Sequence, residues 1–157
     1  SEELKLENNN LRQIIDDSIT QFSISAKERG IGIKIEDSFP SELSILCDRP
    51  KIKRVFSNLI SNAIKYSEKG KEINIFYGSN DKNHIITITD HGVGIPLDEQ
   101  KSLFQEFYRT KKALKMSYGV GLGLYYVKKV VEQHNGRIWF DSKEDVGTSF
   151  NIELPKR

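Results

Sequence analysis

Residues 48–67, DRPKIKRVFSNLISNAIKYS, form one predicted helix with two different faces. Asp48 is a favoured N-cap residue, and Pro50 suits the first turn. The apolar residues recur at i, i+3, i+4 and i+7, which predicts a buried stripe; they are Ile52, Val55, Phe56, Leu59, Ile60, Ala63 and Ile64. At about 100° per residue, the polar residues lie in a narrow opposite sector; they are Arg54, Asn58, Asn62 and Lys65. The helix therefore offers one face to a core and the other to solvent or a ligand.

On both sides of this helix the chain alternates between helical and strand patterns. Residues 11–29 have helical spacing, and Ile31, Ile33 and Ile35 alternate with polar residues or glycine as in a half-buried strand. Further strands are predicted at 43–47, 72–77, 84–89, 137–141 and 148–154, and further helices at about 98–108 and 121–135. This order predicts an α+β fold: a two-layer α/β sandwich with one mixed, mostly antiparallel sheet and helices on one face. We expect residues 1–10, which are polar and rich in asparagine, to be a frayed linker, and residues 11–157 to be one domain.

The composition argues against several classes of function. The chain has 157 residues, 37% hydrophobic and 29% charged, as is typical of a globular domain. A net charge of +2 gives no reason to expect nucleic acid or a membrane surface as a partner. The single cysteine, Cys47, predicts a buried thiol in a reducing compartment rather than a disulfide. We find no signal peptide and no apolar run that could span a bilayer, so we expect a cytoplasmic domain.

The polar sector of the helix at 48–67 has two interpretations. Polar helix faces are usually just solvated. Asparagine, however, is a poor helix former, because its amide competes for backbone hydrogen bonds. Asn58 and Asn62 lie one turn apart beside Lys65; an amide oxygen suits Mg²⁺ and a lysine suits phosphate. The helix alone does not decide between a solvated face and a phosphate site.

Two glycine-containing loops flank later elements. DHGVGIP at 90–96 follows a predicted strand, so it is either an ordinary turn or a carboxylate beside bare backbone that accepts a hydrogen bond from the amine of a flat ring. GVGLGL at 119–124 opens a predicted helix, whose first backbone N–H groups attract phosphate. Its spacing matches neither the dinucleotide fingerprint nor the P-loop, which excludes both.

In this order the segments resemble the catalytic, ATP-binding domain of bacterial sensor histidine kinases, in the gyrase–chaperone–histidine kinase–MutL superfamily. The resemblance covers about residues 11–155. It comprises an N box at 58–66, a first glycine box at 90–96, an F box at 104–109, a second glycine box at 119–124 and the ending GTSF at 147–150. It implies a Bergerat-type ATP-binding fold, ATP and Mg²⁺ as cofactors, and transfer of the γ-phosphoryl group to a histidine.

The resemblance also implies roles for the matching positions. Asn62 would hold Mg²⁺, Lys65 would neutralise phosphate charge and Tyr66 would pack near adenine. Asp90 would accept the adenine amine, with Thr148 helping through a water. The other nucleotide-binding positions are Gly92, Gly94, Ile95, Tyr108, Arg109, Lys112, Gly119, Gly121, Leu122 and Gly123. Gly92 and Gly94 would leave space for the ring, and the basic run at 109–115 is either a solvated loop or a partner of the phosphates.

Asn58 stands where hydrolases of the superfamily carry a glutamate that acts as general base. Because an amide cannot take that proton, Asn58 implies phosphoryl transfer by positioning rather than rapid hydrolysis. Two positions depart from the family pattern: His91 replaces the usual asparagine, and Lys111 replaces a frequent acidic residue. A nucleotide-sensing module without transfer and a chaperone- or topoisomerase-type ATPase are the alternatives.

The phosphate acceptor is expected outside this chain. The histidines are His84, His91 and His134, and none has the context of a phosphoacceptor helix. His134 ends a predicted helix, where an imidazolium is favourable. We therefore expect a separate dimerisation and phosphoacceptor domain, joined through residues 1–10. A response regulator receiver domain is the second expected partner, and a membrane would be reached only through other parts of the parent protein.

Overall fold

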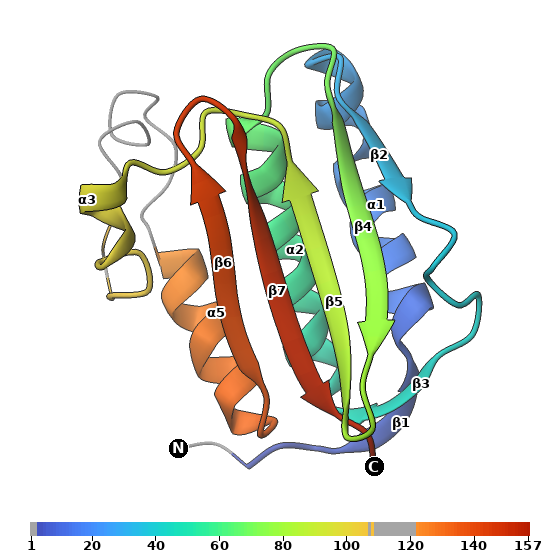
Figure 1. Ribbon diagram of the computed structural model, residues 1–157. Helices are drawn as coiled ribbons and strands as arrows, with labels where there is room; N and C mark the ends of the chain where they lie inside the picture. The colour runs from blue at the N-terminus through green and yellow to red at the C-terminus, as the bar shows by residue number, and fades with distance from the viewer. Residues whose placement is uncertain (1–2, 107, 109–121) are drawn as a thin grey trace.

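The computed structural model describes residues 3–106, 108 and 122–157 (Figure 1). Its elements are β1 (Glu7–Asn10), α1 (Leu11–Glu28), β2 (Gly32–Ile35), β3 (Ser44–Cys47), α2 (Arg49–Tyr66), β4 (Glu72–Ser79), β5 (Asn83–Asp90), α3 (Leu97–Gln100), α5 (Leu122–Gln133), β6 (Arg137–Lys143) and β7 (Gly147–Pro155). Five strands form one sheet in the order β2-β4-β5-β7-β6. Only the β2–β4 pair is parallel. Helices α1, α2 and α5 cover one face of this sheet, so the predicted α+β fold class is confirmed (Figure 1).

Helix α2 lies between α1 and α5 and supplies the centre of the core. All seven residues of its predicted apolar stripe are buried, none more than 4% exposed. Its start is fixed as the sequence predicts, because the Asp48 side chain accepts a hydrogen bond from the Lys51 N–H at 3.3 Å. The stripe therefore turns the opposite, polar sector of α2 away from the core.

The first strand corrects one part of the sequence prediction. Glu7–Asn10 do not fray: they pair antiparallel with β3 in a separate two-stranded sheet. The Asn9 amide also donates to the Cys47 carbonyl at 3.2 Å, and Asn10 caps α1 by accepting from the Gln13 N–H. Backbone pairing and capping need no apolar side chains, so a polar composition did not reveal this strand. β3 accordingly lies outside the main sheet, whereas one single sheet was predicted.

The helix predicted at about 98–108 is shorter than expected. α3 spans only Leu97–Gln100, and the next backbone hydrogen bonds join residues three apart, such as Leu103 N–H to the Gln100 carbonyl. This tighter winding directs Leu103 and Phe104 inward: Leu103 is buried, and the Phe104 ring lies 5.7 Å from that of Phe140. Within the described ranges, no helix combines the length and apolar character that a membrane crossing requires.

Candidate nucleotide-binding site

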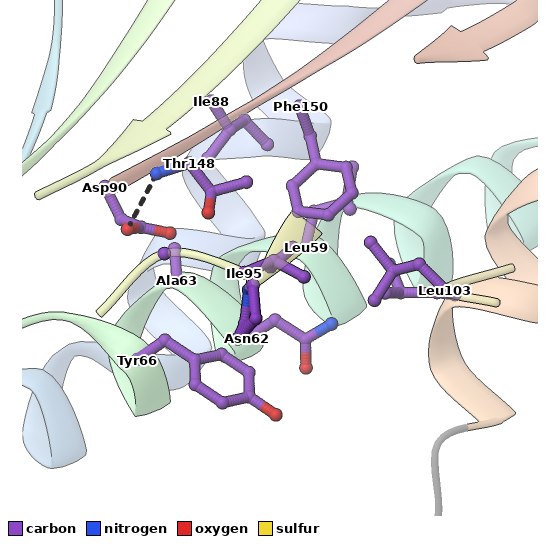
Figure 2. Close-up of a pocket in the computed structure, with 13 residues that line it drawn as sticks. Leu59, Asn62, Ala63, Tyr66, Ile88, Asp90, Ile95, Leu103, Thr148 and Phe150 are labelled. Atoms are coloured by element: carbon purple, nitrogen blue, oxygen red, sulfur yellow. Dashed lines mark hydrogen bonds between the residues drawn. The ribbon is translucent and has the colours of Figure 1, made fainter. Parts of the chain in front are cut away.

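A cavity lies between α2 and the ends of β5 and β7. Its lining residues are Leu59, Asn62, Ala63, Tyr66, Ile88, Asp90, Gly94, Ile95, Pro96, Leu103, Leu124, Thr148 and Phe150. Figure 2 shows Asp90 and Thr148 on the sheet side and Asn62 and Tyr66 on the α2 side. Six of the predicted site residues thus meet in one place, although they come from three separate segments of the chain. The lining is mostly apolar with a few polar groups, as in pockets that bind small molecules.

Asp90, the last residue of β5, is the buried charge of this cavity. Its Oδ1 accepts hydrogen bonds from the Gly92 N–H at 3.1 Å and the Thr148 N–H at 3.3 Å. Burial raises the pKa of Asp90 to about 6, and these two bonds and His91 offset only part of the rise. Both backbone donors end on Oδ1, and neither of them reaches Oδ2. The two bonds fix the orientation of the carboxyl group at the wall of the cavity.

The glycines of the first glycine box act through close backbone packing. A Cβ on Gly92 would lie 1.8 Å from the Tyr66 carbonyl oxygen, and one on Gly94 would lie 2.1 Å from the Lys143 carbonyl oxygen. Gly94 also has a positive φ of 67°, which disfavours a side chain. Gly92 thus lets the loop touch the end of α2, and its role in leaving space for a ring stays a prediction. Of the two, only Gly94 lines the cavity.

The end of α2 is held by Arg29, which the sequence analysis missed. Its guanidinium donates to the carbonyls of Ile64 at 2.8 Å, Lys65 at 3.0 Å and Ser67 at 3.3 Å. These carbonyls end the helix and have no partner within it. The arginine follows α1 in sequence, so only the packing of α1 against α2 reveals its function. It fixes the last turn of α2, from which Tyr66 reaches the cavity.

Asn58 lies one turn before Asn62 on the polar sector of α2. Its amide nitrogen donates to the Gly123 carbonyl at 3.4 Å, at the start of α5. Leu124, the next residue, lines the cavity. Asn58 therefore connects α2 to α5 through a hydrogen bond. Its amide has no group that could act as a base. Lys65 is half-buried on α2 and does not line the cavity.

The remaining predicted residues lie at the edge of the described part or beyond it. The Tyr108 hydroxyl donates to Glu99 Oε1 at 3.1 Å, and burial together with this carboxylate raises the pKa of Tyr108 to about 12. Tyr108 does not line the cavity. Arg109, Lys112, Gly119 and Gly121 lie outside the described residues, as does the side chain of Leu122. The basic run at 109–115 lies there too.

The metal prediction fits the donors present. Among the described residues, no group of three or more His, Cys, Asp or Glu side chains could hold a metal ion. The Asn62 amide supplies one neutral oxygen at the cavity (Figure 2). Mg²⁺ usually takes few protein ligands and completes its shell with water and substrate phosphates. The Asn62 oxygen is compatible with the Mg²⁺ role predicted for it, and that role stays a prediction.

Comparison with known proteins assigns this geometry to a family. The family model of histidine kinase-, DNA gyrase B-, and HSP90-like ATPases matches residues 47–157. The chain belongs to this family. The matched region contains α2, Asp90 and β7, and therefore all the polar groups of the cavity.

Relatives within this ATPase family identify the type of domain. Sensor protein kinase WalK of Staphylococcus aureus is 36% identical over an alignment of 158 positions, which covers 99% of this chain and 37% of WalK. The signal transduction histidine-protein kinase BaeS of Escherichia coli (strain K12) is 35% identical over 125 residues, 79% of this chain and 27% of BaeS. The solved catalytic domain of histidine kinase ThkA is 27% identical with a TM-score of 0.84, covering 98% of this chain and 97% of that one. The chain spans only part of its curated relatives, but it matches nearly all of a histidine kinase catalytic domain.

Proposed function

We propose that this chain is a cytoplasmic domain of a sensor kinase, which binds ATP with Mg²⁺ and transfers the γ-phosphoryl group to a histidine on a separate dimerisation domain. The observation that carries the proposal is the meeting of Asp90, on the sheet, with Asn62, on α2, across one apolar cavity. A buried carboxylate suits an adenine amine, and an amide oxygen on the opposite wall suits the metal of the triphosphate.

Different residues of the chain would have different roles in such a transfer. Asp90 and Thr148 would hold the base, and the apolar wall that includes Leu103 and Phe150 would exclude water from it. Asn62 would hold Mg²⁺, which when bound neutralises phosphate charge. Lys65, on the same sector of α2, would add positive charge. Catalysis would then rest on positioning and charge neutralisation, since Asn58 offers no base for water.

The partners follow from the same proposal. The catalytic domain would take its acceptor histidine from another domain. In support, His84 and His134 are buried, and His91 contacts Asn74 Oδ1 through Nε2 at 3.2 Å. A receiver domain would then take the phosphoryl group. One structural neighbour, histidine kinase ThkA, was solved in complex with the response regulator protein TrrA, which supports this second partner.

Equilibrium binding of ATP in the presence of Mg²⁺ tests the nucleotide site. We expect Asp90→Asn to weaken binding at least tenfold, because a hydrogen bond to a charged group contributes about 1.5–3 kcal/mol. Asn62→Ala should weaken it only when Mg²⁺ is present. Asp141→Asn is the matched control: this exposed residue lies on β6 and does not line the cavity. Unchanged affinity in both site variants would refute the assignment.

Transfer is tested separately, with the histidine-bearing dimerisation domain of the same parent protein added in trans. Label from the γ-phosphate of ATP should reach that domain, and the label should be lost with Asp90→Asn. Rapid release of inorganic phosphate without labelled protein would favour a chaperone-type ATPase instead. Binding without transfer or hydrolysis would favour a nucleotide sensor.

A further inference from the structure

Ser142, on β6, joins two segments that line the cavity. The Ile95 N–H donates to Ser142 Oγ at 2.8 Å. The same Oγ lies 2.8 Å from Thr148 Oγ1 and 3.2 Å from the Gly147 carbonyl oxygen, to which it donates. Ser142 thus contacts the first glycine box and the start of β7 at once, without lining the cavity itself.

The direction of these hydrogen bonds follows from counting protons. A serine hydroxyl has one proton and two lone pairs. The Gly147 carbonyl can only accept, so it takes the Ser142 proton, and the Ile95 N–H occupies one lone pair. Thr148 must then donate its own proton to the other lone pair. The reverse arrangement, with Ser142 donating to Thr148, leaves the Gly147 carbonyl without this bond, so the first arrangement satisfies more groups.

This direction decides what Thr148 offers to a ligand. Since its proton is used by Ser142, the Thr148 hydroxyl turns only lone pairs towards the cavity. Thr148 is 6% exposed, and its N–H donates to Asp90 Oδ1, so the two residues are adjacent at the cavity wall. The carboxylate is also an acceptor. The cavity therefore presents two adjacent acceptors and no donor from this pair.

We propose that Ser142 is a specificity-determining positioning residue that fixes the Thr148 hydroxyl as an acceptor, so that the site takes 6-aminopurine nucleotides and rejects 6-oxopurine ones. A 6-amino group donates to both acceptors, directly or through a water, whereas a 6-oxo group places a third acceptor against them. The inference rests on the proposed ATP site. It adds a residue that acts on the base through Thr148 without touching it.

The sheet contains a matched pair that has the same chemistry without the cavity. Ser149 Oγ lies 2.8 Å from Thr89 Oγ1. Ser149 follows Thr148 on β7, so its side chain points to the opposite face of the sheet. Loss of its hydroxyl removes a serine–threonine bond of the same length. Ser149→Ala is therefore the control for general effects on the β5–β7 pair.

The ratio of ATP to inosine triphosphate affinity, measured by equilibrium binding to the full chain at pH 7.5, tests the proposal. In Ser142→Ala the Thr148 hydroxyl becomes free to donate to the 6-oxo group. We expect the ATP preference to fall about fivefold, the size expected for one neutral hydrogen bond. Ser142→Thr should keep the preference, and Ser149→Ala should leave it unchanged. An equal loss of both affinities in Ser142→Ala, or an unchanged ratio, would overturn the proposal.

Thr148→Val gives an independent test, in case Ser142→Ala does not fold. The test is whether the preference for ATP over inosine triphosphate falls or rises. Removal of an acceptor lowers the ATP preference, whereas removal of a donor raises it, and only the first result supports the proposal. In the Thr148→Val background, Ser142→Ala should have no further effect on the ratio; a further effect contradicts the proposal. Failure of the ATP site itself is recognised separately, because wild type would then bind ATP no better than Asp90→Asn.

Discussion

The two ends of the candidate site are built in different ways. At the Asp90 end, β5, β6 and β7 meet the first glycine box through buried backbone contacts, and a Cβ on Gly92 would lie 1.8 Å from backbone. At the Asn58 end, α2 and α5 meet through side chains: the Asn58 amide donates to the Gly123 carbonyl at 3.4 Å, and the Arg54 guanidinium lies 3.8 Å from the centre of the Tyr126 ring. A Cβ on Gly123 would lie 3.6 Å from the Asn58 side chain, an ordinary contact. The comparison predicts a rigid Asp90 end beside an adjustable Asn58 end.

Alanine at the two glycines should give the largest contrast between the ends. Gly92→Ala forces the loop away from α2. We expect the free energy of unfolding to fall by about 3 kcal/mol and ATP binding to be lost. Gly123→Ala should be neutral or stabilise by up to about 1 kcal/mol, because alanine favours a helix over glycine. Urea unfolding of both variants measures this difference. Equal losses would show that the two ends are equally constrained.

Titration of Asp90 should make the stability of the folded protein depend on pH. Its pKa rises from 3.8 to about 6 on folding, mainly through burial. Folded protein therefore binds the proton more tightly than unfolded protein between these values, so the Asp90 contribution to stability decreases as pH rises from about 4 to 6. The rise of about two pKa units corresponds to about 3 kcal/mol, and Asp90→Asn should remove this contribution.

Thermal unfolding of both proteins across this pH range, with and without ATP, checks the prediction. Asp90→Asn should unfold at a higher temperature than wild type at pH 7 without ligand, because it removes a buried charge and keeps an oxygen for the Gly92 and Thr148 N–H groups. It should also lose the stabilisation by ATP. If the variant is less stable than wild type at pH 7, the charge of Asp90 does not lower the stability of the fold, and the prediction is wrong.

Much of this architecture could be predicted because it depends on local patterns. The stripe of α2, its Asp48 cap and the strand alternation each lie within a few residues, and all were confirmed. The predicted meeting of Asp90, Asn62 and Thr148 relied on the family resemblance, since these residues are far apart in sequence. Their individual roles stay predictions, as do those of residues 109–115, which the structure does not describe.

The parts that were missed depend on tertiary contacts. Ser142 and Arg29 act through neighbours from other elements, and neither has a local signature. His134 was expected as a favourable positive charge at a helix end. Instead it is 1% exposed, its Nε2 accepts from the Asp48 N–H at 3.0 Å, and burial lowers its pKa. Such a contact needs the neutral ring, and it joins the end of α5 to the start of α2.

Asn58 offers the smallest but most specific test of the adjustable end. Asn58→Asp keeps the size of the side chain but places a carboxylate against the Gly123 carbonyl, where the amide had donated. We expect the second turn of α5, whose amides donate to first-turn carbonyls, to exchange its amide hydrogens faster, by about fivefold for a loss of about 1 kcal/mol. Lower pH should reverse the effect, because a protonated carboxyl can donate again. Ser61→Asp, an equal charge on the same helix, controls for repulsion alone. If both variants change exchange equally, or Asn58→Asp changes nothing, Asn58 does not hold α5, and the two ends of the site would have to be distinguished by the glycines alone.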